Sequence, residues 1–190
     1  LIRLADGLSP ERSNSFSGSA DRTFQAGHFQ FNILAEAFYT SLDDVFYLHD
    51  LGTDSQGNSI QERRNGSGAE VYGVNFDAKA AHGSTFSVQA GLTMQRSMYK
   101  QPTQWSDNPD VAAVSNMPRT PDVYGYVTLT AQPLKRLDIS LSGIYTGRMH
   151  VPHFAPSDVI PEDYPYSYID KDEMVHTPQF FELGAKVPYT

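Results

Sequence analysis

The sequence alternates between paired β-type segments and long polar connections. Apolar and polar side chains alternate in seven segments, at residues 13–23, 28–40, 68–80, 84–97, 122–132, 137–145 and 179–187. Within three pairs the connection is short and carries Gly or Pro, at residues 24–27, 81–83 and 132–136. The other connections are long, at residues 41–67, 98–121 and 147–178. Tight turns on one side and long loops on the other are typical of a β-meander that crosses a membrane repeatedly.

The alternation itself indicates strands, because an amphipathic helix would need apolar residues spaced by about 3.6 positions. Residues 28–40 show it best: one side carries Phe29, Phe31, Ile33, Ala35, Ala37 and Tyr39. The other side is polar except at Leu34 and Phe38. Most segments exceed the common soluble strand length of about 5–6 residues and reach the about 9–11 residues of a membrane-crossing strand. The sequence therefore predicts an all-β, antiparallel up-and-down meander of about seven long strands, part of a transmembrane β-barrel.

Composition excludes several classes of function. The net charge of −8 argues against a nucleic-acid partner, because phosphate contact needs clustered Lys and Arg. The chain has no cysteine, so it has no disulfide, thiolate metal site or Cys nucleophile. No run of about 18 apolar residues is present, which excludes a transmembrane helix but not a barrel, whose strands are apolar only at alternate positions. We expect no cofactor. The first residues do not form a signal peptide, so a barrel protein with this sequence would be a mature form or an internal piece.

Aromatic side chains gather near the ends of the predicted strands. Amphipathic rings favour the lipid headgroup zone, which would explain this placement. Tyr and Phe are also good strand formers in any sheet, and both interpretations stay open. The residues concerned are Phe24, Phe38, Tyr39, Phe46, Tyr47, Tyr99, Tyr124, Tyr126, Tyr145, Phe180 and Phe181.

Five short motifs, in order along the chain, resemble those of one family. They are LSPERS at 8–13, AFYTSLDDV at 37–45, NGSGAEVYGV at 65–74, RTP at 119–121 and YTG at 145–147. Together they resemble the lead-in, strand and strand-end motifs of the β-barrel of TonB-dependent outer-membrane receptors. The resemblance covers residues 8–190. It departs from the family at Asn75, where those receptors usually carry Glu.

The resemblance implies a location and a set of partners. It implies a bacterial outer-membrane protein that contacts outer-membrane lipid and captures a small-molecule ligand (an iron chelate, cobalamin or a glycan). Uptake would be driven by a periplasmic energy-coupling protein acting through a plug. Residues 1–190 would form a partial barrel domain, with no plug domain and no closing terminal strand, because such receptors have roughly twenty-two strands. We therefore expect a fragment from the C-terminal half of the barrel, which self-associates when isolated because it exposes sheet edges and an apolar face.

Candidate ligand-binding residues lie in the long connections. Tyr164, Tyr166 and Tyr168 recur at every second position and could form an aromatic face, with Tyr99 and Trp105 on a neighbouring loop. Such a face beside carboxylates would suit a sugar or a siderophore-like chelate. The alternative is that these rings pack against neighbouring residues and hold a long loop in place.

Catalytic and metal sites have weaker support. His150 and His153 have a ligand-like spacing, but no helix places both rings on one side, so we expect no metal site. The other histidines are scattered. Carboxylates pair at Asp43/Asp44, Glu162/Asp163 and Asp170/Asp172/Glu173, and nothing in the sequence fixes the separation that glycosidases need. We expect no enzyme.

Two functions other than transport stay open. One is a soluble, secreted β-rich carbohydrate-binding module that uses the Tyr-rich loop, and the other is a β-fold glycoside hydrolase. The direction in which the strands' apolar sides point distinguishes a transport barrel from a carbohydrate-binding module. A barrel wall keeps its apolar sides on the outside of one sheet, whereas a module brings Phe31, Val74, Val88 and Leu129 together in a core between two sheets.

Overall fold

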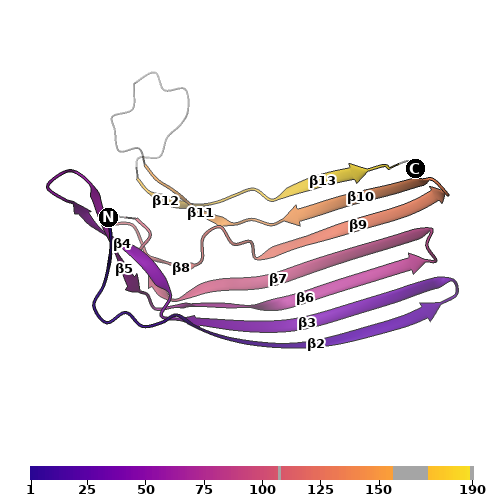
Figure 1. Cartoon of the computed structure of the whole chain (residues 1–190), viewed down its shortest axis with the longest axis horizontal. Helices are drawn as coiled ribbons and strands as arrows, with labels where there is room; N and C mark the ends of the chain where they lie inside the picture. The colour runs from indigo at the N-terminus through magenta and orange to yellow at the C-terminus, as the bar shows by residue number, and fades with distance from the viewer. Residues whose placement is uncertain (107, 156–170, 189–190) are drawn as a thin grey trace, which may run out of the picture.

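The computed structural model describes residues 1–106, 108–155 and 171–188, and all regular structure within them is β (Figure 1). Seven long strands lie side by side in the order in which they occur along the chain, each antiparallel to the next. This confirms the predicted up-and-down meander. The strands are β2 (Arg12–Ala26), β3 (Phe29–Asp43), β6 (Ala69–His82), β7 (Phe86–Thr103), β9 (Val123–Leu134), β10 (Leu137–Thr146) and β13 (Phe180–Lys186).

The turns that join β2 to β3, β6 to β7 and β9 to β10 are short, as predicted, and all lie at one end of the sheet (Figure 1). Gly27 and Gly83 have φ of 61° and 53°, a backbone conformation that side chains with a Cβ seldom adopt. Glycine at these two positions therefore allows the chain to reverse within a few residues.

The long connections gather at the opposite end of the sheet, and the structure corrects our view of them as plain loops. They contain β4 (Phe46–Thr53), β5 (Ser59–Asn65), β8 (Val114–Asn116), β11 (His150–His153) and β12 (Glu173–His176). β4 pairs with β5, β11 pairs with β12, and β8 extends the main sheet by pairing with β7. β1 (Ile2–Leu4) pairs in parallel with β5. Pairing satisfies backbone groups that a long loop would otherwise leave to water.

The register of the long strands keeps every apolar side on the same face of the sheet. Directly opposed residues share a face, and the pairs Ala35–Phe76 and Phe76–Leu92 carry the apolar face across β3, β6 and β7. The pair Leu129–Leu141 continues it across β9 and β10. Because side chains alternate with a period of two, the remaining positions form a second face of Ser, Thr, Asn, Gln and single charges. This confirms the apolar and polar sides that the sequence predicted for the long strands.

The main sheet is a single layer within the described residues. Strands that contact one another extensively are all hydrogen-bonded neighbours, so no second sheet packs on either face. The apolar face stays exposed, with Phe76 at 45% and Leu183 at 87% of full exposure, and Ala69 is the sole buried apolar residue described. Phe31, Val74, Val88 and Leu129 therefore share one open face instead of a core between two sheets. No helix in this part of the chain is long and apolar enough to span a bilayer.

Two rows of aromatic rings border the apolar face. Near the loop end, the register places Phe16, Tyr39 and Tyr72 side by side on three strands, and near the turn end it aligns Phe29 and Phe86 on either side of His82. Phe29 and Tyr39 lie on the same strand, about 34 Å apart at about 3.4 Å per residue. A tilt of about 35–45°, usual in membrane barrels, reduces this to about 24–28 Å along the barrel axis, close to the apolar band of about 25 Å.

Candidate functional site

The polar face of the sheet carries side-chain hydrogen bonds that cross several strands. Asn75 on β6 donates from Nδ2 to Glu36 Oε2 on β3 at 2.8 Å, and its Oδ1 accepts from Thr93 Oγ1 on β7 at 2.9 Å. An amide can donate on one side and accept on the other, and the register places Asn75 directly opposite both partners. A glutamate at this position, which the receptors that the sequence resembles usually carry, would instead place two carboxylates opposite each other.

A second polar network surrounds Tyr126 on β9. Its hydroxyl donates to Asp77 Oδ1 at 2.7 Å and accepts from Gln89 Nε2 at 2.8 Å. The ring reaches Asp77, two strands away, by lying across Gly91, where any Cβ would overlap it. Residues of both networks lie on strands that the sequence predicted, but the contacts depend on register, which the sequence alone did not give.

The long connections are tied together at the loop end of the sheet. Trp105, just after β7, packs against Phe154 with ring centroids 5.7 Å apart, and its Nε1 donates to the Ala112 carbonyl at 3.1 Å. Ser106 donates to one oxygen of Asp172, and the Ala155 backbone N–H donates to the other at 2.8 Å. These donors favour the ionised carboxylate and hold the pKa of Asp172 below its usual value.

Two of the five candidate ligand-binding residues, Tyr99 and Trp105, lie in the described part of the chain. Trp105 is half-buried and its partner is Phe154, which the sequence analysis did not single out. Tyr99 lies within β7, half-buried and opposite Ala69 of β6. The three remaining candidates, Tyr164, Tyr166 and Tyr168, lie outside the described residues.

His150 and His153 do not share a side, as expected, but His150 has a histidine partner that the sequence did not indicate. His150 and His153 lie an odd number of positions apart on β11 and therefore point to opposite faces. His150 instead pairs with His176 of β12, which the sequence analysis treated as scattered. The ring centroids are 4.1 Å apart. Burial and the neighbouring imidazole lower the pKa of His150. The one local signal was a β-branched Val beside each histidine, at Val151 and Val175, which favours extended backbone.

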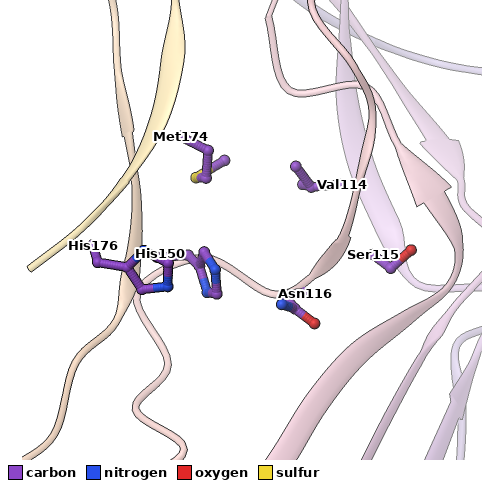
Figure 2. Close-up of a pocket in the computed structure, with 6 residues that line it drawn as sticks. All are labelled: Val114, Ser115, Asn116, His150, Met174 and His176. Atoms are coloured by element: carbon purple, nitrogen blue, oxygen red, sulfur yellow. The ribbon is translucent and has the colours of Figure 1, made fainter.

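These two histidines line a cavity of about 310 Å³ between the β11–β12 ribbon and β8 (Figure 2). Met174, Val114, Ser115 and Asn116 complete its lining. Within the described residues, no group of three or more His, Asp or Glu side chains is placed to hold a metal ion.

Solved structures with the same arrangement are outer-membrane transporters. The FrpB iron transporter from Neisseria meningitidis matches all of this chain with a TM-score of 0.61 at 14% identity. The ferric-catecholate import receptor Fiu from E. coli K12 matches 96% of it with a TM-score of 0.59 at 15% identity. The copper transporter OprC matches 99% with a TM-score of 0.53 at 10% identity. The fold is that of a TonB-dependent receptor barrel segment.

The chain spans about a quarter of the length of these TonB-dependent receptors, with 26% of FrpB, 22% of Fiu and 25% of OprC covered. No protein-family model and no curated protein sequence matches the chain. The likeness to the TonB-dependent receptors is therefore one of fold, carried by backbone arrangement at low sequence identity. Transmembrane β-barrels carry an apolar outer face and a polar inner face, the same division that separates the two faces of this sheet.

Proposed function

We propose that this chain forms part of the wall of an outer-membrane active-transport receptor and has no catalytic role. The observation that carries the proposal is the apolar face: no second layer covers it within the described residues, and two aromatic rows border it, about 34 Å apart along β3 at about 3.4 Å per residue. A soluble protein would have to bury such a face, whereas a lipid bilayer covers it. The hydrogen-bonded polar face is suited to water on the other side.

In this proposal the loop end of the sheet faces outward and captures the cargo. The short strands β4, β5, β8, β11 and β12 all gather there, away from the tight turns (Figure 1). The cargo is a scarce small molecule (an iron chelate, cobalamin or a glycan), and iron and copper appear in the names of the similar structures. Import would be driven by a periplasmic energy-coupling protein that acts through a plug domain. The location is the bacterial outer membrane.

A soluble carbohydrate-binding module has less support. Such a module needs a core between two sheets, and the described strands supply one layer with a single buried apolar residue. The Trp105–Phe154 pair is an aromatic surface of the kind that sugars bind, but it also ties two long connections together. No described contact favours glycoside hydrolysis.

Spin labelling at two adjacent positions of β7 tests the membrane assignment. The chain has no cysteine, so Leu92→Cys and Thr93→Cys each give one labelling site, on the apolar and polar face respectively. In the full chain reconstituted into phospholipid vesicles, we expect the label at 92 to collide more often with oxygen, which partitions into lipid. The label at 93 should collide more often with a water-soluble nickel complex.

The second pair, Phe76→Cys and Asp77→Cys on β6, should repeat this alternation and controls for local effects of one strand. Equal accessibility to both reagents at neighbouring positions would contradict the proposal. Sedimentation without detergent gives an independent check. We expect self-association through the apolar face and sheet edges, whereas a clean monomer with protected apolar positions would favour the soluble module.

A further inference from the structure

Three potential metal ligands share one face of the β11–β12 ribbon. The register pairs His150 with His176 and Pro152 with Met174. Because facing residues and those two positions apart point the same way, His150, His176 and Met174 lie together while Val151 and Val175 point to the other side. Twenty-six positions of sequence separate the two histidines, so only the folded ribbon assembles this set.

The side chains converge on the cavity of about 310 Å³ that the ribbon forms with β8. The two imidazole rings lie side by side with centroids 4.1 Å apart, tilted by 50°, and the Met174 side chain projects into the same space (Figure 2). The rings are close enough for one small ion to bind a nitrogen of each. The volume leaves room for an ion and one further small ligand.

The donor set selects the kind of ion. Neutral imidazole suits several transition metals, but a thioether sulfur is a soft donor that favours copper(I) over zinc or iron. No carboxylate lines the cavity, which disfavours hard cations such as calcium and magnesium. Arg96 and Asp122, whose charges act on His150 in opposite directions, form an ion pair with a nitrogen–oxygen distance of 3.2 Å. A cavity lined by neutral donors is suited to a monovalent ion.

We propose that His150, His176 and Met174 bind one copper(I) ion at the loop end of the sheet. This departs from our sequence-based expectation of no metal site, which considered only the His150–His153 pair. Copper(I) binding itself depends only on the β11–β12 ribbon and the cavity beside it. The step from binding to cargo capture rests on the proposed transport function, in which this end of the sheet receives the ligand.

Competition with a chromophoric copper(I) chelator tests the site. The full chain in detergent micelles is titrated under ascorbate without oxygen, and the copper removed from the chelator is read by absorbance. We expect one copper(I) per chain. His176→Ala should abolish this binding, and Met174→Leu, which removes the sulfur at similar size, should weaken it at least tenfold, about 1.4 kcal/mol.

His153→Ala is the matched control, because His153 lies on the same short strand but points to the opposite face. It should bind copper(I) like the wild-type chain. Unchanged affinity in Met174→Leu, or an equal loss in His153→Ala, would overturn the assignment. Copper X-ray absorption gives a readout that partial unfolding does not mimic: the wild-type spectrum should contain one sulfur scatterer, which Met174→Leu should lose.

The two proposals fail in different ways. If copper(I) binds as expected but the spin labels on β7 do not alternate, the metal site stands and the transport function falls. If the labels alternate and the titration shows no binding that depends on Met174, the barrel wall stands and this site is refuted. Tight zinc binding that is indifferent to Met174 would also refute the copper(I) assignment.

Discussion

Replacement of Gly91 by alanine should displace the Tyr126 side chain from its position on the polar face. A Cβ at position 91 would overlap the Tyr126 ring and lie 2.7 Å from Asp77 Oδ1. The ring is rigid and is held by two hydrogen bonds, so it has to leave its place for the methyl group to fit. Gly91→Ala therefore removes the hydroxyl from both Asp77 and Gln89 in a single step.

The magnitude follows from those two hydrogen bonds. A bond to a carboxylate contributes about 1.5–3 kcal/mol and a neutral one about 0.5–1.5 kcal/mol. Tyr126 is 39% exposed, so water replaces part of this, and we take about 2 kcal/mol in total. Alanine is preferred over glycine in a strand by about 0.5–1 kcal/mol, which leaves a net loss of about 1–1.5 kcal/mol. With a urea dependence of about 1–3 kcal/mol per molar, the unfolding midpoint should fall by about 0.3–1.5 M.

The assay is urea unfolding of the detergent-solubilised chain, followed by circular dichroism. Gly18→Ala on β2 is the matched control, because a Cβ there meets open space, and its midpoint should stay level or rise slightly. Tyr126→Phe should cost stability in the wild-type chain but add little to Gly91→Ala, whose ring is already displaced. A Gly91→Ala midpoint no lower than that of Gly18→Ala, or additive effects in the double mutant, would refute the reasoning.

Two further predictions concern charge. Asn75→Glu removes a hydrogen-bond donor and places a carboxylate opposite Glu36. Urea unfolding should therefore show a loss of about 1–3 kcal/mol in the free energy of unfolding, which Glu36→Gln should largely restore. An equal loss in Asn75→Gln would contradict this explanation. The pKa of Asp172 is held below 3.8, so the loop contact that depends on its carboxylate is complete above that pH and is lost as the pH falls through the lowered pKa. Fluorescence of Trp105, the only tryptophan, should report this change with a midpoint below pH 3.8. The Asp172→Asn variant should lack the transition. A midpoint at or above pH 3.8 would show that the transition does not come from Asp172.

The long strands could be predicted because their signal is local. Alternation depends only on whether a position is odd or even within a strand, so the faces around Phe29 to Tyr39 followed from the sequence without knowledge of any partner. The turns at Gly27 and Gly83 were also local, since each needs a backbone conformation that glycine readily adopts. What alternation does not determine is which residues oppose each other, and both polar networks depend on that register.

The short strands at the loop end escaped prediction because contacts distant in sequence hold them. Asn65 at the end of β5 donates to the Ser9 carbonyl at 2.9 Å and accepts from its N–H at 2.8 Å, across 56 positions. The Gln61 N–H donates to the Leu1 carbonyl at 2.9 Å. The same holds for His150 and His176, whose proximity depends on how β11 pairs with β12. The spacing of His150 and His153 in the sequence therefore could not indicate that His150 lies beside His176.

The shared register also limits how the length of such a chain can change. One residue inserted midway along β6 would exchange the sides of all residues beyond it, so that Asp77 and Lys79 would lie on the apolar face while Ala78 would lie on the polar face. On a lipid-facing side a Lys costs up to about 2–4 kcal/mol at the bilayer midplane, and an Asp or a position nearer the interface costs less, so such a shift would be destabilising in the proposed barrel. Among natural homologues, single-residue insertions and deletions should therefore be confined to the connections such as 54–58, while the long strands keep a constant residue count.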